Sequence, residues 1–210
     1  MSASAELVLA NDLLAWHLAW PAGALQSLAI ENRLTGRTFR LSAARELAVR
    51  LSASPLGLSE PTVEAAGFVV AAVEQAGPDA AVFRLHSSAH GLDARLYYRL
   101  EGATRRKWAE LVSDRDVLLL DVDLDDFGFA GDSSGGGDGE PLLLAGELFA
   151  AVEHPAGQNV AADGRVRLGH SPGRLLSAGQ GFRSHAALVS AAPAGGALAH
   201  FVEYIEARCL

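Results

Sequence analysis

The stretch Leu92–Glu101, LDARLYYRLE, alternates apolar and polar side chains with a period of two. Successive side chains of a strand point to opposite faces of a sheet, so this pattern predicts a strand with one buried and one outer face. The expected buried set is Leu92, Ala94, Leu96, Tyr98 and Leu100. The outer set is Asp93, Arg95, Tyr97 and Arg99.

Similar segments extend from it in both directions. Thr104–Val112 alternates in the same way, and Leu118–Leu124 places aliphatic residues on one face and aspartates among those on the other. Short strands with little helix between them are typical of antiparallel sheets, so we expect an all-β fold, a large antiparallel two-sheet sandwich. The other predicted strands are Glu6–Ala10, Leu13–Trp20, Leu25–Glu31, Thr38–Leu41, Leu47–Ser52, Phe68–Gln75, Val82–Ser87, Leu142–Val152, Arg165–His170, Leu175–Ala178 and Ala186–Ala191.

Four segments depart from this pattern. Ser42–Glu46 is compatible with a short helical turn or a loop, and Pro55, Gly57 and Pro61 indicate a loop. Asp132–Gly139, DSSGGGDG, has no apolar anchor and predicts a mobile, dispensable loop. Ala197–Cys209 has helical spacing and predicts a short C-terminal helix. Its expected apolar face is Leu198, Phe201, Val202, Ile205 and Ala207.

Length and charge narrow the function classes. The 210 residues suit a single domain, 1–210, and half of them are hydrophobic, which is enough for a substantial core. The net charge of -8 argues against nucleic-acid binding, which needs a basic face. No membrane segment or secretory signal is recognisable, so a cytoplasmic location is expected. The single cysteine, Cys209, excludes an internal disulfide.

The sequence contains no motif for a cofactor or a zinc site, since the seven histidines show no HxH or HExxH spacing. The aspartates of Asp121–Asp126 are the one candidate for calcium, although a solvated outer sheet face explains their spacing without a metal. The GDSSGGG run at Gly131–Gly137 departs from the serine-protease GDSGG pattern and lacks a partner motif, so we set that interpretation aside.

Three stretches resemble a known family when taken in order. They are IENRLTGR at Ile30–Arg37, RKWAELVSDRDVLLLDVDLDDF at Arg106–Phe127, and FAAVEHPAGQN at Phe149–Asn159 followed by VRLGHSPGRLL at Val166–Leu176. Together they resemble the N-terminal β-supersandwich of α-galactosidase-like glycoside hydrolases, which is similar to the galactose mutarotase superfold. In that family a catalytic barrel of about 250 residues follows the sandwich. The resemblance implies a barrel after residue 210, which this chain lacks.

Candidate substrate-binding residues gather at two predicted turns. Glu153, His154 and Asn159 surround a Pro–Gly turn, and His170 and Arg174 border a second turn. Carboxylate, imidazole and amide groups bond sugar hydroxyls directionally, so we expect one shared rim that contacts a sugar or another domain. The alternative is that these polar side chains cap their own backbone, or that Arg174 merely pairs with Glu153.

Tryptophans are the other candidates for sugar contact. Trp16 and Trp20 are four residues apart in one predicted strand, so their side chains point to the same face and could form a stacking platform. Such residues more often lie in the core. We expect Trp108 in the core, and Trp20, at a strand end, stays open as a substrate-binding candidate.

Three functions stay open. The first is a non-catalytic accessory domain that covers or shapes the substrate mouth of a glycosidase barrel, with oligomer contacts possible. The second is a mutarotase-like aldose epimerase, which needs a His acid and a Glu base; the candidates, His90 or His170 with Glu153 or Glu203, are paired by no motif. The third is a free-standing carbohydrate-binding module.

Overall fold

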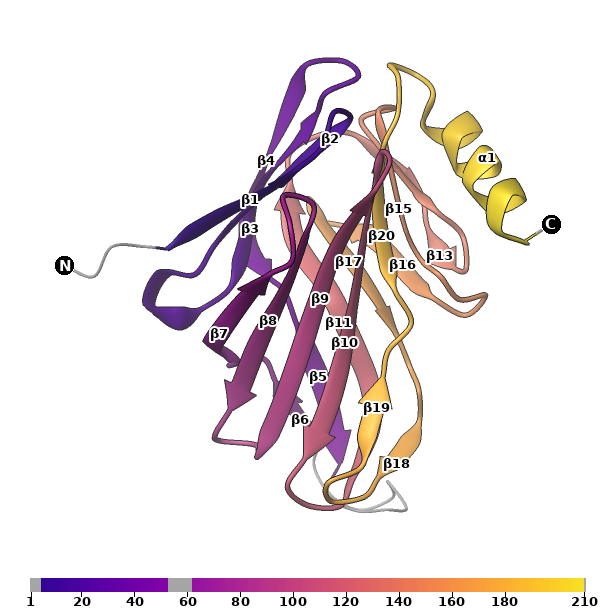
Figure 1. Ribbon diagram of the computed structural model, residues 1–210. Coiled ribbons are helices and arrows are strands. Elements are labelled where there is room, and N and C mark those ends of the chain that lie inside the picture. The colour runs from indigo at the N-terminus through magenta and orange to yellow at the C-terminus, as the bar shows by residue number, and fades with distance from the viewer. Residues whose placement is uncertain (1–4, 53–61, 210) are drawn as a thin grey trace.

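The computed structural model describes residues 5–52 and 62–209 and has two antiparallel sheets packed face to face, with one helix at the side (Figure 1). This confirms the predicted antiparallel sandwich with a C-terminal helix. The loop expected at Pro55, Gly57 and Pro61 lies outside the described residues.

The larger sheet has eleven strands, and its main path runs β1-β2-β3-β4-β11-β17-β16-β13. Strand β5 pairs with β11 and β6, and β18 also pairs with β11. The strands are β1 (Glu6–Ala10), β2 (Leu14–Ala19), β3 (Gln26–Asn32), β4 (Arg37–Arg45), β5 (Ala48–Ser52), β6 (Val63–Ala65), β11 (Val117–Phe129), β13 (Gly137–Asp138), β16 (Gln158–Ala162), β17 (Arg165–His170) and β18 (Arg174–Leu176). A short 3-10 turn, η1 (Pro21–Gly23), separates β2 from β3.

The smaller sheet has nine strands in the order β12-β14-β15-β20-β10-β9-β8-β7, and β19 also pairs with β10. Strand β20, the last strand in chain order, therefore lies between β15 and β10 in the middle of the sheet. The strands are β7 (Val69–Gln75), β8 (Ala80–Ser87), β9 (Leu92–Glu101), β10 (Thr104–Ser113), β12 (Ser133–Gly135), β14 (Leu142–Leu144), β15 (Leu148–Val152), β19 (Gly181–Arg183) and β20 (Ala187–Ala191).

The core lies between the two sheets. The alternation of Leu92–Glu101 is realised as predicted, because its apolar set is buried and Tyr97 and the charged residues face outward. Each fully buried large apolar side chain contributes about 1.5–3 kcal/mol relative to an exposed one, so this face fixes the register of β9.

Strand β4 continues through the segment for which we expected a helical turn or a loop. Across β11, Asp126 pairs with Arg45 and Gly128 with Ser42, so Ala43 and Ala44 together oppose Phe127. This is a β-bulge, and Ala43 has a positive φ of 45° within it. The break in alternation at this point therefore marks a bulge and not the end of the strand.

The glycine-rich segment at Asp132–Gly139 is also different from the prediction. Strand β12 pairs with β14 in the smaller sheet, and β13 pairs with β16 in the larger one. Both lie at the end of the sandwich where the two sheets are joined by Gly136. The glycines supply the positive φ angles of this connection, 92° at Gly136 and 76° at Gly139.

Replacement of Gly139 by alanine is expected to destabilise the fold by about 1–3 kcal/mol, since the backbone is left-handed there and a Cβ would overlap the Pro155 carbonyl oxygen. Gly173→Ala is the matched control, because Gly173 also has a positive φ, 52°, but open space around it. Urea denaturation of both variants measures the difference. Equal midpoints would support the dispensable loop instead.

Helix α1 (Ala197–Cys209) forms over the predicted residues, and its packed face includes Phe201 of the predicted set together with Tyr204, which was not predicted. The rings of Phe201 and Tyr204 pack on Phe149 of β15 at centroid distances of 5.4 and 5.8 Å. Leu198 and Val202 are 55% and 47% exposed and form an outer apolar row with Ile205. In the described part of the chain, no helix has the length and apolar character needed to cross a membrane.

Candidate functional site

A cavity of about 300 Å³ lies at one rim of the sandwich. Three connections meet there: the turn between β15 and β16, the turn between β17 and β18, and the segment between β19 and β20. The structure thus places His154, His170 and Arg174 on one cavity. The lining residues are His154, Ala156, His170, Ser171, Pro172, Arg174, Phe182, Arg183 and His185.

Three imidazoles pack together at this rim pocket. The ring of His185 lies 4.1 Å from that of His154 and 5.0 Å from that of His170, measured between centroids. The Nδ1 atom of His154 accepts a hydrogen bond of 3.1 Å from the backbone N–H of Ala156. The neutral His154 ring therefore carries its proton on Nε2, which makes Nε2 a donor.

The surroundings of His170 and His185 disfavour their charged forms. Burial, together with His185 and His154, lowers the pKa of His170 to about 4, and Asp121 opposes this only weakly. Burial and His154 also lower the pKa of His185. At neutral pH His170 and His185 are thus hydrogen-bonding groups without charge.

Two arginines add positive charge to the same pocket. Arg174 and Arg183 are both exposed, and neither forms an ion pair within residues 5–52 and 62–209. The guanidinium of Arg183 lies 5.2 Å above the ring centroid of Trp108, which leaves its edge accessible. Among the lining residues there is no carboxylate.

Glu153 turns away from this pocket towards helix α1. Its carboxylate accepts hydrogen bonds of 2.5 Å from Arg106 Nη2 and from the Tyr204 hydroxyl. Burial and Glu153 raise the pKa of that hydroxyl. A cavity of about 560 Å³ lies beside this cluster, between α1 and β15. The pair of Arg174 with Glu153 that we weighed is not formed.

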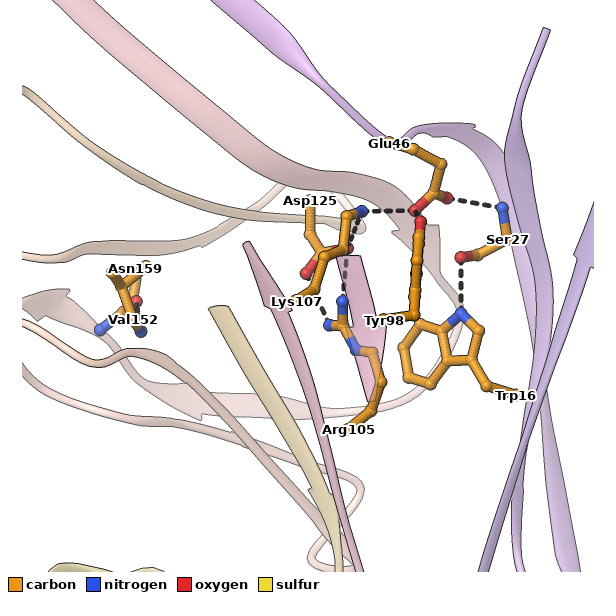
Figure 2. A network of polar contacts seen from close by, with 9 residues as sticks. All are labelled: Trp16, Ser27, Glu46, Tyr98, Arg105, Lys107, Asp125, Val152 and Asn159. Carbon is orange, nitrogen blue, oxygen red and sulfur yellow. Dashed lines mark hydrogen bonds and ion pairs between the residues drawn. The ribbon is translucent and has the colours of Figure 1, made fainter. Parts of the chain in front are cut away.

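Asn159 is fully buried and serves the backbone. Its Oδ1 accepts the Val152 N–H at 2.9 Å (Figure 2). Its Nδ2 donates to the Glu140 carbonyl at 2.8 Å. The side chain thereby holds the turn that carries His154, and it is not exposed to a ligand. The self-capping alternative applies to this residue.

The tryptophans do not form the platform we considered. Trp16 is fully buried, and its Nε1 donates a hydrogen bond of 2.7 Å to Ser27 Oγ. Trp20 packs edge-on against Phe83, with 5.5 Å between the ring centroids, and lies several strands away from the rim pocket. Trp108, expected in the core, is half-buried on the outer face of the smaller sheet. There it stacks on Tyr97 at 4.9 Å with an interplanar angle of 3°.

The epimerase pairings are not formed in the part of the chain that the structure describes. His90 bonds Ser87, and Glu203 bonds His200 on the same helix. Neither Glu153 nor Glu203 forms a hydrogen bond with His170 or His90.

A charged network that the sequence did not reveal lies between the sheets (Figure 2). Asp125 of β11 accepts 2.6 Å from Arg105 Nη2 and 2.8 Å from Lys107 Nζ, both from β10. Lys107 also pairs with Glu46, which accepts the Tyr98 hydroxyl at 2.5 Å. All five side chains are almost completely buried.

The charges of this network balance, with two cations and two carboxylates. Burial alone would raise the pKa of Asp125, but Arg105 and Lys107 outweigh it and hold that pKa below its usual value. Burial and the charge of Glu46 raise the pKa of Tyr98 well above its usual value. The network joins the sheets, and within it the buried Nε of Arg105 has no hydrogen-bond partner among the described residues.

The structure does not support calcium binding by the aspartates of Asp121–Asp126, because Asp125 belongs to the buried network and is separated from the others. Leu124 is an extra residue between Asp123, which pairs with Gly169, and Asp125, which pairs with Leu168. This bulge turns Asp125 inward and leaves Asp121 and Asp126 on the outer face of the sheet, where Asp121 pairs with Arg50 and Asp126 is buried beneath its partners. Asp126 pairs with Arg45 and Arg165. The carboxylates do not form one solvated face.

Comparisons with known proteins define the class of fold. No family model and no curated protein sequence matches the chain. Among solved structures, a GH36 α-galactosidase from Geobacillus stearothermophilus in complex with raffinose matches with a TM-score of 0.60 and 10% identity, over 91% of this chain and 41% of that one. The galactosidase domain of an α-galactosidase–sucrose kinase matches with a TM-score of 0.58 and 11% identity, over 90% and 41% of the two chains.

A galactose mutarotase related enzyme from Lactobacillus acidophilus matches with a TM-score of 0.55 and 9% identity, over 90% of this chain and 98% of that one. The fold is therefore mutarotase-like, and it is similar to the N-terminal supersandwich region of the GH36 α-galactosidases, as the resemblance implied. The chain spans 41% of the length of those α-galactosidases.

Proposed function

We propose that this chain is a non-catalytic accessory domain of a carbohydrate-active enzyme, which covers or shapes the substrate mouth of a glycosidase barrel. The observation that carries the proposal is the likeness of more than nine-tenths of the chain to the N-terminal region of a GH36 α-galactosidase that was crystallised with raffinose. The catalytic barrel itself is supplied by a partner domain.

Two surfaces support this role. The rim pocket presents arginine and histidine donors, which can bond sugar hydroxyls or the polar edge of another domain. The outer row of α1, Leu198, Val202 and Ile205, offers an apolar strip for a packed domain. A free-standing carbohydrate-binding module would use the first surface only.

The second candidate is a mutarotase-like aldose epimerase. It is favoured by the match that covers 98% of a galactose mutarotase related enzyme. It is disfavoured by the histidines, since the described residues bring none of the His–Glu pairs we considered into contact.

The purified chain is expected to release no nitrophenol from aryl α- or β-galactosides and glucosides, and to leave the mutarotation rate of galactose unchanged. The reason is that, among the described residues, His90 and His170 contact neither Glu153 nor Glu203, the pairs considered for acid–base chemistry. Polarimetry and chromogenic assays measure both activities. Mutarotation that His170→Gln abolishes would replace the accessory role with the epimerase.

A further inference from the structure

The rim pocket is cationic in a chain whose net charge is -8. Two arginines, three histidines and a serine line it, without a carboxylate. We propose that this pocket is an anion subsite, which takes the carboxylate or phosphate group of a small sugar acid or sugar phosphate. The attached sugar rests on the proposed function, whereas the anion subsite itself does not.

The donors of the pocket are available to a ligand. Arg174 and Arg183 have no ion-pair partner among the described residues, and a guanidinium offers a planar fork that matches carboxylate and phosphate oxygens. His154 adds an Nε2–H donor, because its Nδ1 is occupied by the Ala156 N–H. A volume of about 300 Å³ lies at the small end of ligand pockets and suits a single sugar ring.

The nearest carboxylates are already engaged elsewhere. Asp121 of β11 pairs with Arg50 and accepts the Ser171 hydroxyl, and Glu153 is bound by Arg106 and Tyr204. A third acid is Glu110 of β10, which pairs in register with Arg183 but accepts a hydrogen bond of 2.8 Å from the Tyr97 hydroxyl. None of the three forms an ion pair with the pocket's arginines, so their positive charge is left for a ligand.

The imidazoles make binding depend on pH. His170 and His185 face each other and His154, with Asp121 and Glu153 as the acids that act on them. A bound anion stabilises the imidazolium form and raises the pKa of these histidines, so binding takes up protons. Affinity is therefore expected to increase as the pH falls below about 6.5, because the pKa values of His170 and His185 lie below that ordinary value in the free pocket and a bound anion raises them.

The test uses the full chain with inorganic phosphate, galacturonate, galactose 6-phosphate and neutral galactose as probes, by calorimetry at two pH values. Arg174→Gln and Arg183→Gln should each weaken anion binding about tenfold or more, since a lost charge-assisted bond is worth that much. Arg40→Gln is the matched control, because Arg40 is exposed on β4 and has no ion pair in the described chain. All three arginines are exposed, so the variants should fold.

The probes separate the sources of the anion. Galacturonate binding assigns a sugar acid, and galactose 6-phosphate binding assigns a sugar phosphate. Phosphate binding without sugar binding keeps the anion subsite and removes the carbohydrate role. The subsite is overturned if galactose binds as tightly as both charged sugars, if no anion binds at pH 5.5, or if the pocket variants match Arg40→Gln. As an independent readout, NMR should show that phosphate raises the pKa of His170 from about 4.

Discussion

Replacing Asp125 by asparagine is expected to lower the free energy of unfolding by about 3–5 kcal/mol, the usual cost of removing one partner from a buried ion pair. The loss leaves Arg105 and Lys107, both fully buried, with Glu46 as the one remaining carboxylate of the network. The low dielectric between the sheets makes that excess positive charge costly. Guanidinium denaturation at neutral pH measures the change.

Asp123→Asn is the matched control on the same strand. Asp123 lies two residues away on the outer side of the bulge, and burial raises its pKa, so its charged form is not favoured by its surroundings. Its replacement is expected to change stability by less than about 1 kcal/mol. A similar loss in both variants would mean that the cost comes from β11 in general and not from the buried charges.

The stability of the protein is expected to fall by about 3 kcal/mol between pH 6.5 and pH 4 through His170 alone. The folded state holds the pKa of His170 at about 4, below the ordinary value of 6.5. The unfolded chain therefore binds the proton first as the pH falls through this window. The contribution of neutral His170 is complete above the window and lost at its lower end.

Comparison with His170→Gln isolates this effect. The variant lacks the titrating ring, so its unfolding free energy should depend less steeply on pH over the same window, by the same about 3 kcal/mol. Urea titrations at half-unit pH intervals measure both curves. Parallel curves for the two proteins would show that His170 titrates normally in the folded state.

Much of the fold could be predicted because alternation reports burial directly. Leu92–Glu101 and Arg165–His170 have the predicted bounds, since their apolar residues all face one side of a sheet. The bulges at Ala43 and Leu124 could not be predicted. An extra residue moves the following side chains to the opposite face of the sheet, but it leaves the kinds of residue in the segment unchanged. The glycines of Asp132–Gly139 were misread for a similar reason: left-handed strand connections and mobile loops use the same residue type.

The candidate site was likewise predicted only in part. The two turns with Pro155 and Pro172 were predicted to share a rim, and the structure brings His154, His170 and Arg174 together there. Arg183 was missed as a member, because it comes from a later segment whose position depends on the pairing of β19 with β10. Glu153 was misplaced, since its partners lie on α1 and β10.

The position of β20 has a consequence for biosynthesis. A ribosome releases β10 and β15 long before Ala187–Ala191, the strand that must enter between them. Until then the nascent chain carries two open strand edges, which are the kind of surface that recruits chaperones or leads to aggregation. Translation that stops upstream of Ala187 would leave a smaller sheet in two halves.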